Sequence, residues 1–185
     1  TDWIAEIDDA AGRIKGYVRR TAVTRLNLSG LDRPIEVKLE FTQHTGSFKA
    51  RGAFNRLLSG GVPEGGVVAA SGGNHGAAVA YAAARLGIPA RIFVPEMAGP
   101  TKIALIERTG ADLTVVPGSY ADALAAALDH EAATGAMQVH AYDAPGTVTG
   151  QGTCMREWEE QGLGADTVLI AVGGGGLIGG AIAWA

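Results

Sequence analysis

The sequence contains a single cysteine, few aromatic residues and little charge, and each scarcity excludes a class of protein. Cys154 has no second thiol to pair with, so no internal disulfide holds this fold, as is typical of a reducing compartment. With 15 Lys and Arg against 19 Asp and Glu, the net charge of -4 leaves no basic surface for nucleic acid. We therefore expect a cytoplasmic protein without a nucleic-acid partner, and we interpret Cys154 as a small buried residue rather than a nucleophile.

Long apolar runs are also missing. No apolar stretch approaches the roughly 18 residues that a membrane-spanning helix needs, and the N-terminal residues are polar rather than an apolar signal core. We therefore expect no membrane partner. The hydrophobic share of 47% nevertheless excludes a disordered chain, and 185 residues suffice for one domain or slightly more.

Glycine is the abundant residue, with 28 positions, roughly twice the usual share of about 7%. The glycines follow no three-residue period, which excludes a collagen-like chain. They gather instead in short runs, at Gly72-Gly73, at 173–176 and at Gly179-Gly180. Such clusters indicate places where the backbone turns tightly or approaches a ligand closely.

Apolar segments alternate with helical patterns along most of the chain. Strands are expected over 35–39, 67–70, 91–94, 113–116, 138–141 and 167–172. Helices are expected over 3–18, 76–86, 101–108, 120–133 and 148–161, and from 177 onward. This order predicts an α/β fold with a parallel sheet covered on both faces. The last helix has room for barely two turns, so we expect the sequence to be part of a longer protein.

The first of three glycine-containing turns places a lysine at the start of a helix. Ser47 is a natural helix cap, which would put Lys49 in the first turn of the helix that follows. A cation there is disfavoured by the helix dipole, and burial would lower its pKa, as a nucleophilic amine requires. The alternative is an ordinary solvated lysine.

Two further turns join a strand to a helix and offer backbone N–H groups to an anion. In the turn over 71–76, Asn74 and His75 add side-chain donors, the alternative being a capped turn with an incidental histidine. The turn over 173–176 also begins a G-x-G-x-x-G spacing through Gly179, as in dinucleotide-binding domains. The acidic residue that this fingerprint needs would lie beyond Ala185, so we interpret the segment as a phosphate-binding turn.

A lysine amine, an anion-binding turn and a phosphate cradle are the parts that hold pyridoxal phosphate as a Schiff base. The sequence resembles the fold-type II pyridoxal-phosphate enzymes, most closely the serine/threonine dehydratase (ammonia-lyase) branch. Four motifs stand in the family's order: TGSFKARGA at 45–53, SGGNHG at 71–76, GQGT at 150–153 and GGGGL at 173–177. The resemblance covers residues 15 to 185.

The resemblance assigns a role to each motif. Lys49 would form the internal aldimine with the cofactor and later move the Cα proton, with Phe48 beside the cofactor ring. Asn74 would hydrogen-bond the 3-hydroxyl of the ring. The phosphate would be held by Gly173, Gly174, Gly175, Gly176 and Leu177. The substrate carboxylate would bind the N–H groups of Ser71, Gly72, Gly73, Asn74 and His75. We assign no metal ligand.

The resemblance also implies the reaction and the architecture. The reaction is β-elimination of L-threonine and/or L-serine to a 2-oxo acid and ammonia, in a homodimer that binds this small hydroxy amino acid. The architecture is a pair of three-layer parallel-sheet domains of the tryptophan synthase β-like kind, incomplete here. Residues 1–45 would begin the large domain, 46–150 would form the small domain, and 151–185 would return to the large one.

Two positions discriminate within the family, and a third departs from its usual pattern. Cysteine-synthase and threonine-synthase relatives tend to carry threonine at His75, so the histidine favours the dehydratases. Serine racemases use a serine where Gly72 stands as a second acid/base, so we predict elimination rather than racemisation. His44, where relatives often carry proline, is interpreted as a loop surface residue. The open alternatives are an amino-acid racemase or another fold-type II lyase, an inactive fragment, and a nucleotide-binding dehydrogenase-like domain.

Overall fold

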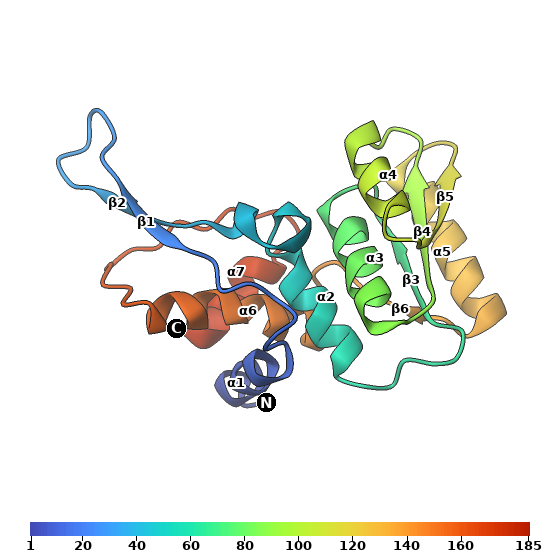
Figure 1. Ribbon diagram of the computed structural model, residues 1–185, viewed down its shortest axis with the longest axis horizontal. Helices are drawn as coiled ribbons and strands as arrows, with labels where there is room; N and C mark the ends of the chain where they lie inside the picture. Colours follow the sequence, from blue (N-terminus) through green and yellow to red (C-terminus); the bar gives the residue numbers. More distant parts are fainter.

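The computed structural model describes residues 1–185, which form two lobes side by side with helix α2 (Lys49–Leu58) between them (Figure 1). One lobe is built on a four-stranded parallel sheet in the order β5-β4-β3-β6. Its strands are β3 (Val67–Ala70), β4 (Ala90–Pro95), β5 (Asp112–Val116) and β6 (Met137–Gln138). The strands expected at 67–70, 91–94 and 113–116 are confirmed, and β6 is shorter and begins one residue earlier than expected.

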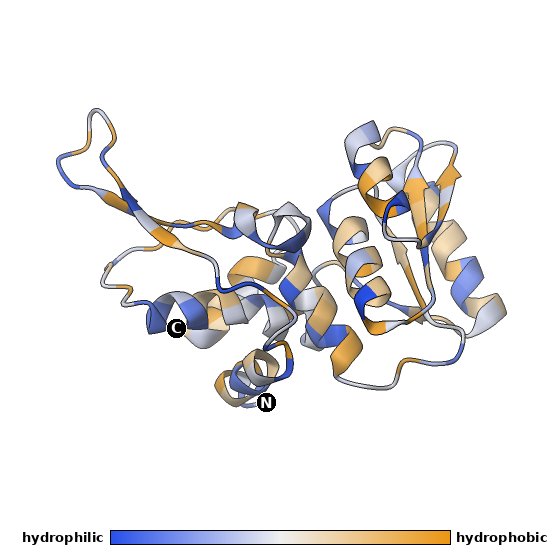
Figure 2. Ribbon diagram, in the orientation of Figure 1, coloured by the Kyte–Doolittle hydropathy of each residue, from blue (hydrophilic) through white to orange (hydrophobic).

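Helices cover both faces of this sheet, as the apolar strands predict. Helices α3 (Asn74–Leu86) and α4 (Pro100–Glu107) lie on one face and α5 (Tyr120–Thr134) on the other (Figure 1). Alternate residues of β3 point to opposite sides: Val67 and Ala69 join the core under α3, and Val68 and Ala70 the core under α5. Hydrophobic residues accordingly follow the strands in Figure 2. The three-layer α/β class is therefore confirmed.

The other lobe is mainly helical. It contains α1 (Trp3–Arg13), α6 (Pro145–Glu160), α7 (Gly176–Trp184) and an antiparallel pair, β1 (Val23–Leu26) with β2 (Ile35–Lys38). Two single 3-10 turns, η1 (Glu40–Thr42) and η2 (His44–Gly46), lead from β2 to α2. Strand β1 was not expected, because its four residues lack a clear alternation. None of the helices combines the length and apolar character needed to cross a bilayer.

The strand expected over 167–172 is wrong. These residues adopt no regular structure, and none of their backbone groups takes part in a backbone hydrogen bond. The side chain of Leu169 is 93% exposed and Val172 is also exposed. The apolar composition predicted a buried strand, but no strand lies beside this segment to pair with it. A strand requires a ladder partner, which composition alone does not supply.

Glycines bring α6 into direct backbone contact with both α2 and α7. A Cβ added at Gly150 would lie 2.7 Å from the carbonyl oxygen of Arg51 in α2. One added at Gly180 in α7 would lie 2.5 Å from the amide nitrogen of Gly152 in α6. Since real Cβ atoms do not approach so closely, these positions require glycine. Helix α6 therefore fixes the two helices that carry Lys49 and the glycine run 173–176.

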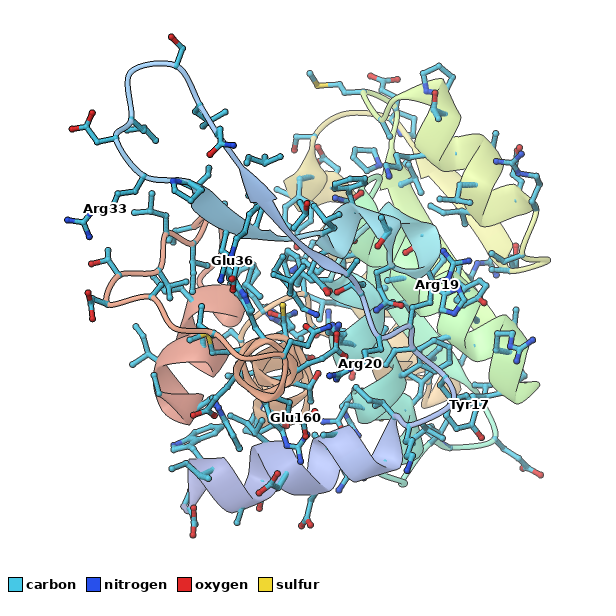
Figure 3. All side chains as sticks on the ribbon, turned by 60° about the vertical axis from the view of Figure 1, so that its left-hand side comes forward. Tyr17, Arg19, Arg20, Arg33, Glu36 and Glu160 are labelled. Atoms are coloured by element: carbon cyan, nitrogen blue, oxygen red, sulfur yellow. The ribbon has the colours of Figure 1, made fainter.

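A buried ionic cluster joins the same elements. Arg51, only 1% exposed, donates to both carboxylate oxygens of Glu40 and of Glu157, at 2.7 to 3.1 Å. Lys38, at the end of β2, also pairs with Glu157. The buried guanidinium of Arg51 is therefore paired with two carboxylates, as a buried charge requires. Toward the surface, Arg20 and Glu160, labelled in Figure 3, pair at 3.5 Å, whereas Arg33 extends outward from the β1–β2 loop.

Candidate active site

Lys49 is the first residue of α2, as the sequence predicts. The helix begins one residue later than Ser47 alone would suggest: Phe48 takes the cap position, and the Ser47 hydroxyl accepts the Lys49 N–H at 3.4 Å. The side chain is half-buried, and its ammonium donates to the carbonyl oxygen of Ala141 at 2.5 Å. It also lies 5.2 Å from the centre of the Phe48 ring. Burial lowers the pKa of the Lys49 amine, so the direction expected from the sequence is confirmed.

The segment 139–142, between β6 and α6, is where the three glycine turns meet. Lys49 contacts it at Ala141, and the His75 ring bonds the Val139 carbonyl oxygen at 2.7 Å. A Cβ added at Gly174 would overlap the ring of Tyr142, so the glycine run 173–176 lies against the same segment. Residues more than 120 positions apart are thus gathered within one small region.

His75 is buried at the start of α3 and is held neutral. Burial lowers its pKa to about 4, the bond to Val139 opposes this, and the charges of Lys49 and His140 lower it further. Since its Nε2 faces a carbonyl oxygen, that nitrogen carries the proton and donates. Near neutral pH, Lys49 is therefore the cation of this site, and His75 contributes no charge.

The glycine run 173–176 presents unpaired backbone donors. Helix α7 begins at Gly176 without a side-chain cap, and no N–H group from Gly173 to Gly176, nor that of Leu177, donates to another backbone group. Gly175 has φ +87, a conformation open to glycine but strained for other residues. Aligned free N–H groups at a helix N-terminus form an anion site of the kind that binds phosphate.

The turn 71–76 is a second such place, with a narrower set of donors than expected. The N–H of Ser71 continues the sheet by donating to Phe93, and that of Gly73 donates to the Ser71 hydroxyl. The N–H groups of Gly72, Asn74, His75 and Gly76 have no backbone acceptor, and no side chain caps α3. These four remain available to an anion, whereas those of Ser71 and Gly73 do not.

The side chain of Asn74 is exposed, and the structure does not bring it into contact with Lys49. His44 is half-buried rather than a surface residue: its ring stacks on Tyr81 with 4.9 Å between centres, and its Nδ1 lies 3.2 Å from the tyrosine oxygen. Cys154 is buried, and burial first, with Glu40 nearby, raises the pKa of its thiol to about 12. The interpretation of Cys154 as a buried, unreactive residue is therefore confirmed.

Sequence reasoning missed the segment 139–142 and the full role of the GQGT motif. Gln151 of that motif is buried and donates from Nε2 to the same Ala141 oxygen that Lys49 contacts, at 3.3 Å. The run His-Ala-Tyr-Asp after a weak strand was the available signal, since polar and aromatic residues that follow a parallel strand lie at the edge where sites form.

A sizeable cleft lies elsewhere in the structure. It has a volume of about 540 Å³, lies between α1 and α6, and includes neither Lys49 nor the glycine run. Arg20, Arg51 and Arg156 line it, and each already pairs with a carboxylate. The cleft therefore offers no free guanidinium to an anion, and the chemistry of the chain gathers around Lys49 instead.

Comparison with known proteins identifies a family. A family model described as "Pyridoxal-phosphate dependent enzyme" matches residues 14–184. The chain is 39% identical to an L-threonine ammonia-lyase of Thermotoga maritima, over 96% of this chain and 45% of that protein. It is 36% identical to a phenylserine dehydratase of Ralstonia pickettii, over 96% and 55% respectively.

A solved structure of maize serine racemase superposes with a TM-score of 0.91 at 34% identity. It covers 98% of this chain, which in turn covers 56% of that protein. The chain thus spans about half the length of the curated relatives it matches.

Proposed function

The chain belongs to the family of pyridoxal-phosphate dependent enzymes, and from this premise we propose that the protein eliminates the β-hydroxyl of L-threonine and/or L-serine. The products would be a 2-oxo acid and ammonia. The relatives named L-threonine ammonia-lyase and phenylserine dehydratase support a lyase of this kind. The observation that carries the proposal is a half-buried lysine amine of lowered pKa that contacts the segment 139–142, against which His75 and the glycine run 173–176 also lie.

The residues present fit pyridoxal phosphate. The glycine run supplies free N–H groups, and nothing lies within 4 Å of the place that a Cβ would take at Gly173 or at Gly175. The backbone at these two positions is therefore open to the approach of a phosphate. We propose that Gly173 to Gly176 and Leu177 hold the phosphate, with Lys49 at the aldehyde end, Phe48 beside the ring and Asn74 near its hydroxyl.

The bound cofactor supplies an electron sink for the electron pair left at Cα when its proton is removed. Lys49 is the base that removes that proton, since burial lowers its pKa and so raises the fraction of neutral amine near pH 7. The free N–H groups of Asn74 and His75 orient the substrate through its carboxylate. Because His75 is neutral, it adds no charge beside the Lys49 amine.

The surroundings of Gly72 favour elimination over racemisation. Racemisation needs a second acid/base on the opposite face of Cα, and glycine has no proton to give. A Cβ at Gly72 would meet the side chains of Ala98 and Val94, at 3.0 Å from the latter. Position 72 therefore lacks the group and also the space for it. A racemase remains the second candidate, because maize serine racemase shares the fold.

A direct assay tests the proposal. The complete protein is incubated with pyridoxal phosphate and either L-threonine or L-serine, and 2-oxobutanoate or pyruvate is measured by coupled reduction. Lys49→Ala should abolish product formation and the absorbance of the cofactor–lysine adduct, while Lys15→Ala, which removes an exposed lysine, should leave both unchanged. Accumulation of D-serine with little pyruvate would favour the racemase. An unchanged adduct in Lys49→Ala contradicts the assignment.

The homodimer and the domain boundaries 1–45, 46–150 and 151–185 stay predictions from the resemblance. Sedimentation of the complete protein tests the first. Limited proteolysis, with cleavage sites mapped relative to residues 45 and 150, tests the second.

A further inference from the structure

Gln151 has an unpaired hydrogen-bond acceptor in the protein interior, where such unpaired groups are rare. Its side chain is 1% exposed, and its Oε1 is one of two buried side-chain oxygens without a hydrogen-bond partner, the other being Thr45 Oγ1. A buried amide oxygen without a donor is costly, because it loses its bonds to water and gains none in exchange. Such an atom indicates that a partner is missing from its surroundings.

The orientation of the Gln151 amide is fixed by its other end. Nε2 donates to the carbonyl oxygen of Ala141, which also accepts from the Lys49 ammonium. Turning the amide over would place two oxygens face to face, so Oε1 is the atom that points away from Ala141. On one side, the Gln151 amide therefore contacts the same carbonyl oxygen that accepts the hydrogen bond of Lys49.

On its other side the amide faces the glycine run. A Cβ added at Gly176 would lie 2.5 Å from Gln151 Oε1, so this oxygen is in direct contact with the first residue of α7. The backbone N–H groups of 173–176 have no backbone acceptor. The unpaired oxygen of Gln151 thus lies beside the unpaired backbone N–H groups of the glycine run.

We propose that Gln151 is a positioning residue that links the glycine run to Lys49. When an anion orders the run, Oε1 accepts one of its backbone N–H groups, while Nε2 holds the Ala141 carbonyl against the lysine amine. The proposal rests on the proposed function in one respect, that the run 173–176 is the phosphate site. In this proposal, the side chain of Gln151 fixes the position of the glycine run relative to the amine of Lys49.

Sulfate is a suitable probe, because its charge is constant over the pH range used. In the complete protein without cofactor, Gln151→Leu should weaken sulfate binding by about tenfold, the effect of losing one hydrogen bond in a buried site. Gln161→Leu is the matched control, since Gln161 lies just past the other end of α6 and contacts Lys38 and Thr21 instead. It should bind sulfate as the unaltered protein does.

Gln151→Glu supplies a readout that a merely structural role would not move. A protonated carboxylic acid presents the same donor–acceptor pair as the amide, whereas the carboxylate has no donor and repels sulfate. Sulfate affinity of this variant should therefore be weakest at pH 8 and recover toward that of the unaltered protein as the pH falls to 5. The Leu variant should show no such recovery. In isotope-labelled amide spectra, the Gly175 or Gly176 signal should shift on sulfate binding in the unaltered protein and in Gln161→Leu, and this shift should be absent in Gln151→Leu.

The outcomes separate the two proposals. If the unaltered protein binds neither sulfate nor pyridoxal phosphate, the phosphate site is wrong and this inference falls with it. If it binds both, but Gln151→Leu matches Gln161→Leu and Gln151→Glu shows no recovery at low pH, the inference is overturned and the proposed function stands. Should the Leu variant fail to fold by circular dichroism, the pH dependence of the Glu variant decides.

Discussion

Replacing Arg51 by methionine removes the cation at the centre of the buried ionic cluster and strands two carboxylates. Arg51 donates four hydrogen bonds of 2.7 to 3.1 Å, two to Glu40 and two to Glu157. Removing one partner from a buried ion pair costs about 3–5 kcal/mol. The Glu40 and Glu157 side chains keep 14% and 13% exposure, and Lys38 still pairs with Glu157, so we expect the lower end, about 3 kcal/mol.

Urea unfolding of the complete protein, followed by circular dichroism, measures this loss. Natural stabilities are about 5–15 kcal/mol, so the expected change is a large fraction of the total. Arg56→Met is the control, because Arg56 on the same helix bonds only Ser59 and the Gly60 carbonyl near the surface; we expect a change within about 0.5 kcal/mol. Adding Glu40→Gln to Arg51→Met should restore about 1 kcal/mol, since one stranded charge is then neutral.

The loss should also depend on pH in a definite direction. Burial acts to raise the pKa of Glu157, but the bonds and charge of Arg51, followed by those of Lys38, outweigh it and lower the pKa. The stability from this group is present above the ordinary glutamate range and lost as pH falls through the lowered pKa. The difference between the unaltered protein and Arg51→Met should therefore be constant near neutral pH and shrink as the pH falls below the ordinary glutamate pKa of 4.5. A difference below 1 kcal/mol at pH 7, or one that grows as pH falls, would refute the reasoning.

Three further outcomes are expected. Gly180→Ala should destabilise the fold by about 1–3 kcal/mol in urea unfolding, because its Cβ meets the α6 backbone, whereas Gly12→Ala, with open space around it, should be neutral or stabilising by up to about 1 kcal/mol. Cys154 should resist a thiol reagent in the folded protein at pH 8 and react fully after unfolding, since its pKa is raised to about 12; fast reaction in the folded state would contradict its burial. His75 should show no titration by proton NMR between pH 8 and pH 5, since its pKa is lowered to about 4, and a midpoint near 6.5 would show an exposed ring instead.

The parts of the fold that follow from local pattern could be predicted from the sequence. The apolar run of β3 and the glycines that end α3 and α5 in the left-handed conformation, at Gly87 and Gly135, depend on residues close in the chain. The segment 167–172 could not be predicted in the same way. Its apolar residues indicate what the segment would bury, but pairing depends on which other strand lies beside it.

The candidate site also contains features that depend on local sequence and features that depend on contacts between distant residues. The position of Lys49 at a helix start and the glycine turns depend on local residue types, and these were found. Their meeting at Ala141 and Tyr142 depends on contacts between residues about 30 to 90 positions apart, which spacing does not encode. The pairing of Arg51 with Glu157 was missed for the same reason, because the sequence does not indicate which carboxylate an arginine contacts in the fold.

The glycine contacts along α6 have a mechanical consequence. Where two helices touch through their main chains, no rotatable side chain lies between them to absorb a displacement, so they shift together or not at all. Helices α2 and α7 are both joined to α6 in this way, through Gly150 and Gly180. The backbone of Lys49 and the start of α7 are thereby held on one frame. Helix α3, which carries Asn74 and His75, meets α2 through side chains instead, so it can shift relative to this frame.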